Sequence, residues 1–157
     1  MKKLLISTVV LTSVLTMAAC AADDEGNSSE DQHNQDVESQ PVISQTDMGD
    51  KMSELSYTVY DFDVLYEESE FEGEIENDEG LIEAEFYNPF SDITARGSDA
   101  FEAIFPVLQE LELNPDMDDE EAITESLAAF DLPDNYLKAQ LEVVFSDGTE
   151  KTYEIKK

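Results

Sequence analysis

The sequence has few of the side chains on which many catalytic and disulfide-bonded proteins depend. It contains one cysteine, Cys20, and one histidine, His33, among its 157 residues. A disulfide bond within the monomer is therefore excluded. Neither residue falls in the C-terminal part from Glu54 onward, which carries the clearest folding signals. A hydrolase built on a nucleophile and a histidine is excluded for that part of the chain.

Positively charged side chains are also scarce. The chain has 8 Lys and Arg against 39 Asp and Glu, a formal net charge of −31. Nucleic acids are excluded as partners, because binding to phosphates depends on clustered Lys and Arg. Docking on anionic lipids through charge is excluded for the same reason. Any attachment to a membrane must therefore act against electrostatic repulsion.

The first 19 residues have the pattern of a bacterial lipoprotein signal peptide. Lys2 and Lys3 form a basic head, an apolar run covers 4–17, and Ala18-Ala19 precedes Cys20. The run is shorter than the roughly 20 residues of a spanning helix and ends in small residues, which favours a cleaved secretory signal. We expect cleavage between Ala19 and Cys20 and acylation of Cys20, which would anchor the protein to the extracytoplasmic face of the cell membrane. The alternative is a secreted protein with a free thiol, which is a liability in an oxidising compartment.

Residues 20–53 are predicted to be the lipidated cysteine and a disordered acidic tether. From 21 to 53 the chain has 9 acidic residues and one lysine, with few apolar side chains. Such a segment buries too little apolar surface to offset its ordering entropy, and its charges repel one another, so we expect it to be extended. His33 lies in this segment with no other histidine or nearby cysteine, which indicates a solvated side chain rather than a metal ligand.

Residues 54–157 are predicted to form one α+β domain. Apolar and polar residues alternate in five stretches that we predict to be strands: 56–67, 70–76, 81–87, 139–145 and 153–155. In the first, Tyr57 and Val59 begin the apolar face, and a change of phase near Tyr60 indicates a bulge. The turn signals Asn77-Asp78-Glu79-Gly80 and Asp147-Gly148 predict two hairpins.

Two helices are predicted between the hairpins. The first has an apolar stripe at helical spacing, formed by Phe101, Ile104, Phe105, Leu108 and Leu111. It has a start signal at Gly97-Ser98-Asp99, and Pro106 predicts a kink or a late start. Asp118 and Glu121 have the spacing of a capping box for the second helix. That helix is predicted to bury Ala122, Ile123, Leu127 and Phe130. The expected fold is an antiparallel sheet of four to five strands with two helices packed on one face, in the order β-β-β-α-α-β-β.

Several short motifs in this domain resemble those of a known family. They are the strand Phe62-Asp63-Val64, the run 126–132 (Ser-Leu-Ala-Ala-Phe-Asp-Leu), Tyr136, Ser146-Asp147-Gly148 and the ending Glu154-Ile155-Lys156-Lys157. On these motifs the domain, from about Tyr57 to Lys157, resembles the YusW-like family of Gram-positive bacterial lipoproteins. The resemblance implies a small surface-anchored domain of unknown function. It implies no catalytic residues, because none is assigned in the family.

One acidic run has the spacing of a calcium-binding loop. Positions 1, 3, 5, 7 and 12 of that pattern supply oxygen ligands, and the corresponding residues are Asn114, Asp116, Asp118, Glu120 and Glu125. However, Asp119 replaces the glycine that the pattern needs for its sharp turn. A run of acids is also typical of a helix N-terminus, which is the favoured interpretation.

Two further sets of residues are candidate sites. The acids between Glu68 and Glu85 could form a cation-binding sheet face or a catalytic carboxylate pair, although a solvated face is favoured in so acidic a chain. Six aromatic residues could line a groove for a small ligand, although packing in the core is favoured. They are Tyr57, Tyr60, Tyr66, Phe86, Tyr87 and Phe90.

We expect a non-catalytic binding module that uses no cofactor. Its partner would be an envelope protein, a peptide or a small ligand. The alternatives are a calcium-binding surface protein and a carboxylate-only hydrolase of envelope glycans. From Glu54 onward the chain has 30 acidic and 5 basic residues, a net charge of −25. Because self-repulsion of this size destabilises a compact state unless salt screens it, we expect an adaptation to saline or alkaline surroundings.

Overall fold

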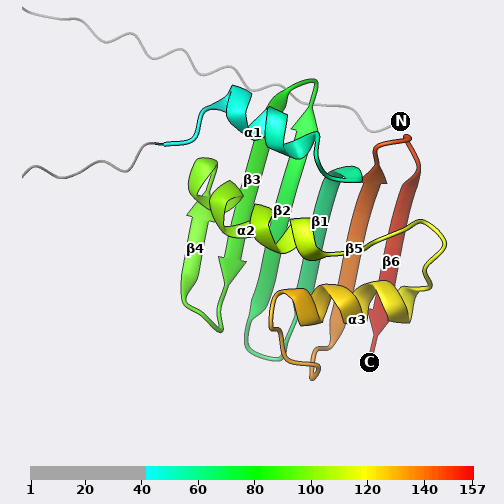
Figure 1. The fold of residues 1–157 in the computed structure, drawn as a ribbon. Coiled ribbons are helices and arrows are strands. Elements are labelled where there is room, and N and C mark those ends of the chain that lie inside the picture. Colours follow the sequence, from blue (N-terminus) through cyan, green and yellow to red (C-terminus); the bar gives the residue numbers. More distant parts are fainter. Residues whose placement is uncertain (1–41) are drawn as a thin grey trace, which may run out of the picture. The chain divides into compact units, whose positions relative to one another are not determined.

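The computed structural model describes residues 42–157, which contain a six-stranded sheet and three helices. All neighbouring strands are antiparallel, in the spatial order β4-β3-β2-β1-β5-β6 (Figure 1). The strands are β1 (Tyr57–Leu65), β2 (Glu70–Asp78), β3 (Leu81–Asn88), β4 (Ile93–Arg96), β5 (Lys138–Phe145) and β6 (Glu150–Lys156). The helices are α1 (Gln45–Met52), α2 (Ser98–Glu110) and α3 (Asp119–Ala129). Both the α+β class and the antiparallel sheet are confirmed, but the sheet has one strand and the domain one helix more than expected.

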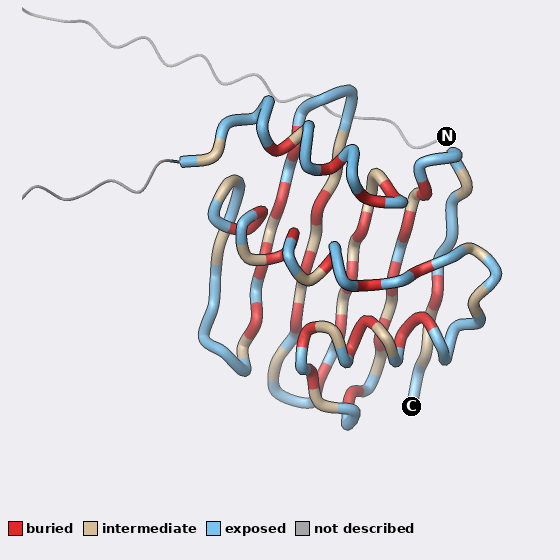
Figure 2. The backbone as a smooth tube through the Cα atoms, in the orientation of Figure 1, coloured by how far each residue is buried: buried red, intermediate tan, exposed pale blue. Residues whose placement is uncertain are grey.

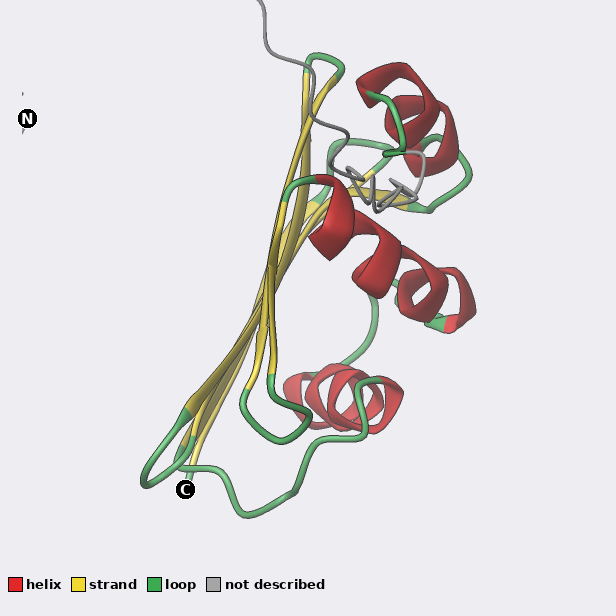
Figure 3. Cartoon of the chain, turned by 90° about the vertical axis from the view of Figure 1, so that its left-hand side faces the viewer, coloured by secondary structure: helices red, strands yellow, loops and turns green. Residues whose placement is uncertain are grey.

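The three helices lie on one side of the sheet, and within residues 42–157 no helix covers its other face, which we call the uncovered face (Figure 3). Residues that point toward the helices are buried along every central strand, and their neighbours are half-buried or exposed (Figure 2). The centre of the core is a cluster of rings around Phe130, whose centroid lies 5.2 Å from that of Phe71 and 6.0 Å from that of Phe86. No helix of residues 42–157 is long and apolar enough to cross a membrane.

Helix α1 occupies eight residues that the sequence assigned to the extended tether. Ser44 caps its N-terminus, and Met48 and Met52, one turn apart, are each 3% exposed. The side chain of Gln45 donates to the carbonyl of Ile82 and accepts from its N–H, at 3.0 and 2.8 Å. The expected tether is therefore wrong for Gln45–Met52, because two methionines at helical spacing and one amide suffice to dock this segment on β3. The signal peptide, Cys20 and the tether up to residue 41 lie outside the described residues.

Strand β4 was missed because its four residues carry little pattern. Ile93 and Thr94 are exposed, Ala95 is half-buried and Arg96 is exposed, so no apolar alternation marks the strand. It forms because Asp92, with a φ of 56°, turns the chain back to pair with β3.

The bulge in β1 lies earlier than the sequence indicated. The register of β1 against β5 shifts between Tyr57 and Val59, and Tyr60 then points into the core with no exposed surface. Val59 therefore lies on the uncovered face, and its predicted place on the apolar side is wrong. The expectation of a bulge itself is confirmed.

Both predicted helices are present. Helix α2 begins at Ser98 and contains Pro106, so a start after the proline is wrong. Asp118 caps α3, and its Oδ1 accepts from the N–H of Glu121 at 2.9 Å, as the capping-box spacing predicted. The hairpin of β5 and β6 is also confirmed, with Gly148 at a φ of 85°.

Candidate functional site: the acidic sheet face

The uncovered face of the sheet is lined with carboxylates at facing positions. Asp61 on β1 lies opposite Glu74 of β2 and Glu142 of β5, and Asp63 lies opposite Glu72. On β2 and β3, Glu74 also faces Glu85. We define the acidic face by these residues and their neighbours: Asp61, Asp63, Glu72, Glu74, Glu76, Glu83, Glu85 and Glu142. Side chains at facing positions are about 5 Å apart at Cβ, so like charges there destabilise the sheet.

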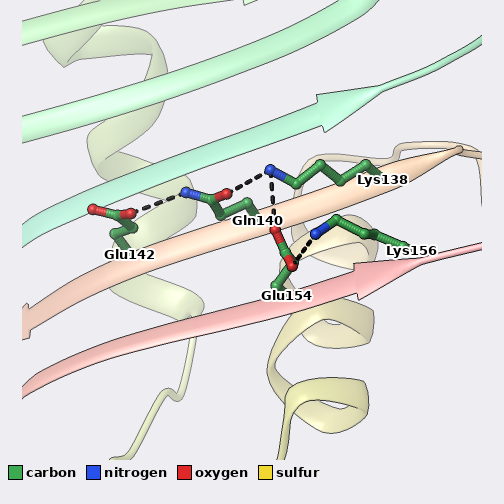
Figure 4. Close-up of polar contacts among 5 residues, drawn as sticks. All are labelled: Lys138, Gln140, Glu142, Glu154 and Lys156. Atoms are coloured by element: carbon green, nitrogen blue, oxygen red, sulfur yellow. Dashed lines mark hydrogen bonds and ion pairs between the residues drawn. The ribbon is translucent and has the colours of Figure 1, made fainter.

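Among residues 42–157, the basic side chains that form ion pairs on this face lie toward its two sides. At the β4 margin Arg96 pairs with Glu85 at 2.9 Å. At the other margin Lys138 and Lys156 share Glu154 (Figure 4). Within residues 42–157 these are the three ion pairs, so the carboxylates of β1 and β2 in the middle of the face have no cationic partner there.

Gln140 links Lys138 to Glu142, which lies nearer the middle of the face, through two hydrogen bonds. Its Oε1 accepts from Nζ of Lys138 at 2.6 Å, and its Nε2 donates to Oε1 of Glu142 at 2.9 Å (Figure 4). The hydrogen bonds from Lys156 and Lys138 lower the pKa of Glu154. The hydrogen bonds of Gln140 end at Glu142, so Asp61 on the next strand faces a carboxylate rather than an amine.

The middle of the face resists ionisation. Partial burial, then the charges of Asp63, Glu74 and Glu142, raise the pKa of Asp61 from 3.8 to about 7. Burial and neighbouring carboxylates also raise the pKa values of Asp63, Glu72 and Glu74. Near neutral pH Asp61 therefore holds its proton more tightly than an ordinary aspartate does.

This geometry concentrates negative charge on one face of the sheet. A hollow of about 340 Å³ touches the face at its β4 side, where Glu74, Glu85 and Arg96 contribute to its lining. There the carboxylate that faces Glu74 is already paired with Arg96. A general acid and base need a substrate held between them, and the facing acids of this sheet instead lie side by side on adjacent strands.

The structure gives the calcium-loop candidates other contacts. Oδ1 of Asn114 accepts from the N–H of Asp116 at 3.1 Å, and Asp118 caps α3. Glu120 is in the first turn of α3 and Glu125 lies further along the helix. In the described part of the chain, no group of three or more His, Cys, Asp or Glu side chains is placed to hold a metal ion.

The aromatic candidates are not brought together in a groove. Tyr57, Tyr60, Tyr66 and Phe86 are buried in the core, whereas Tyr87 and Phe90 are 42% and 49% exposed. The hydroxyl of Tyr57 donates to the carbonyl of Leu108 at 2.8 Å, which fixes this ring as part of the fold. The groove hypothesis is therefore wrong for the four buried rings.

Two features of the structure were not predicted from the sequence. The first is the cluster of Lys138, Gln140 and Glu154, which depends on the pairing of β5 with β6. In the sequence it was visible only as polar residues that alternate along the two strands. The second is a hollow between α2 and α3. Its only signal in the sequence was a few apolar residues that lie outside the predicted apolar stripes of the two helices. Ala19, Cys20 and His33 lie outside the described residues.

Comparison with known proteins gives a family but no characterised relative. Neither the curated proteins nor the solved structures include a significant match to the chain. The model of the YusW-like protein family matches residues 58–147. That span runs from β1 into the β5–β6 turn and contains all eight residues of the acidic face and both long helices. The chain therefore belongs to the YusW-like protein family.

Proposed function

We propose that this protein is a membrane-anchored extracytoplasmic lipoprotein that acts as a non-catalytic binding module. Acyl chains on Cys20 would hold it to the membrane, and the residues before α1 would set its reach. The acidic face would be the surface that meets cations and basic partners. The lipobox pattern at Ala18-Ala19-Cys20 supports the anchor.

The observation that carries the binding role is the unneutralised middle of the acidic face. Four carboxylates occupy facing positions there: Asp61, Asp63, Glu72 and Glu74. Within residues 42–157, the arginine and lysine side chains that form ion pairs lie at the margins of the face. This arrangement costs stability, because each pair of facing carboxylates repels and burial raises the pKa values. Because these carboxylates destabilise the fold rather than stabilise it, a role in binding or solvation explains them better than a role in folding.

Salt is the condition under which this face is least costly. The screening length falls from about 30 Å at 0.01 M salt to about 3 Å at 1 M, below the separation of facing side chains. We therefore propose a saline setting for the protein. An alkaline setting is the alternative, and there the whole face is ionised and its repulsion is greatest.

The test is the melting temperature of the full chain in NaCl, KCl and CaCl₂. General screening predicts a steady rise that is the same for NaCl and KCl up to molar concentrations. A specific calcium site would instead give a saturating rise at millimolar calcium or below, abolished by Asp116→Asn or Asp118→Asn. A melting temperature that is flat from low to molar salt would refute the screening argument.

A further inference from the structure

A second candidate surface lies in the helix layer, on the other side of the sheet from the acidic face (Figure 3). It is a hollow of about 1030 Å³ between the C-terminal half of α2, the connecting residues 111–117 and α3. Its floor is apolar. Val107, Met117 and Ala129 are partly buried and pack against the core, and the exposed Pro106 and Ala128 continue the apolar surface.

The rim of this groove is acidic on both helices and on the connection. Glu110 and Glu112 line one side, and Glu121 and Glu125 line the other. Within residues 42–157 their carboxylates take part in none of the ion pairs or side-chain hydrogen bonds, and no lysine or arginine lines the groove. Helix α2 ends at the groove without a basic residue in its last turn, so the negative end of its dipole adds to the same potential.

The apolar floor and the acidic rim together limit which class of molecule can bind in the groove. An anionic lipid or an acidic peptide would bring like charges against four carboxylates. A second copy of this chain would do the same, since its domain has a net charge of −25. A small neutral apolar ligand would leave the rim carboxylates without a partner. A segment with apolar side chains on one face and Lys or Arg beside them satisfies both the floor and the rim, which is the helix-in-groove mode of peptide recognition.

We propose that the groove between α2 and α3 is a docking site for a cationic amphipathic peptide segment of a partner protein. Its apolar side chains would cover Val107, Met117 and Ala129, and its basic side chains would pair with Glu110, Glu121 and Glu125. This site goes beyond the acidic face, which lies on the other side of the sheet. Failure of one site therefore leaves the proposal for the other intact.

The test uses the full chain and a fluorescently labelled synthetic peptide of about 14 residues, long enough for a marginal helix. The peptide contains only Leu and Lys, arranged so that Leu recurs at helical spacing. A scrambled peptide of the same composition, without an apolar face, is the peptide control. Binding is measured by fluorescence anisotropy at about 0.15 M NaCl, where long-range attraction to the net charge is largely screened.

Two matched double variants locate the binding. Glu110→Gln with Glu125→Gln removes two charges from the rim of the groove. Glu67→Gln with Glu150→Gln removes the same charge from exposed positions outside the groove. We expect the groove pair to weaken binding about tenfold or more and the control pair to change it less than about threefold, because only the former loses direct charge pairs. The scrambled peptide should bind at least about tenfold more weakly than the amphipathic one.

Three results would overturn the proposal. The first is no binding of the amphipathic peptide, the second is equal weakening by both double variants, and the third is equal binding of the two peptides. The last two would mean that the peptide responds to net charge alone. Melting temperatures confirm that each variant is folded. As a second measurement, NMR amide shifts on adding peptide should concentrate at Val107, Met117 and Ala128 and leave β1 and β2 unchanged.

Discussion

A substitution at Asp61 can measure how much the repulsion on the acidic face lowers the free energy of unfolding. Asp61 is half-buried on β1, and the groups that face it are carboxylates on both neighbouring strands, Glu74 on β2 and Glu142 on β5, with Asp63 two residues along its own strand. Its pKa is about 7 in the folded protein and 3.8 in its ordinary state. The folded protein therefore binds this proton more tightly than the unfolded chain does.

The sign of the pH dependence follows from this difference. Between about pH 4 and pH 7 the folded state carries the proton on Asp61 and the unfolded state has lost it, so stability from this group falls as the pH rises. Above pH 7 the full penalty is present, and below about pH 4 it is absent. Asp63, Glu72 and Glu74, whose pKa values are also raised, act in the same direction.

The substitution Asp61→Asn should remove the penalty and keep the size of the side chain. The difference between a pKa of 3.8 and one of about 7 corresponds to about 4 kcal/mol as an upper bound. Because the side chain is only half-buried and solvent screens its neighbours, we expect a gain of about 1–2 kcal/mol at pH 8. The gain should be close to zero at pH 4.

The measurement is urea unfolding of the full chain at pH 4, 6 and 8 in low salt, followed by far-UV circular dichroism. Glu67→Gln, which removes an exposed charge from the β1–β2 turn, is the matched control and should give less than half of the effect. An Asp61→Asn variant that is equally stabilised at pH 4 and pH 8, or destabilised at pH 8, would refute the reasoning. Molar NaCl should reduce the gain, because it screens the same repulsion.

Three further predictions concern the fold and the anchor. Gly148→Val should destabilise the domain by about 1 kcal/mol or more in thermal melting, because a β-branched residue resists a φ of 85°. An added Cβ meets no atom within 4 Å there, so the cost would come from the backbone conformation alone. An unchanged melting temperature would contradict this reasoning. Phe130→Ala should cost about 3–5 kcal/mol in urea unfolding, since its ring contacts those of Tyr60, Phe62, Phe71 and Phe86, and a cost below about 1 kcal/mol would show that the core refills the space. Cys20→Ser should move the protein from the membrane fraction to the medium in a blot of cell fractions, and continued membrane retention of the variant would sink the lipoprotein proposal.

The features that the sequence determined are those with a local physical cause. The alternation of Ala139, Leu141 and Val143 required a strand with one apolar face, and Asp147-Gly148 supplied the positive φ that returns the chain to β6. The capping of α3 by Asp118 depends on residues three positions apart. Each of these is decided within one turn or one strand, so the rest of the protein did not have to be known.

Only the tertiary structure decided which carboxylates face one another. The acidity of each strand was visible in the sequence, but Asp61 meets Glu142 because β1 pairs with β5, about 80 residues later in the chain, and its raised pKa depends on that pairing. Strand β4 has no apolar alternation, and helix α1 has only two buried methionines, so both elements depend on the surface and the edge that β3 offers them. The groove between α2 and α3 depends on how the apolar stripes of these two helices pack on the same sheet. Such contacts join residues that are distant in the chain, and a pattern read within a short window contains no information about them.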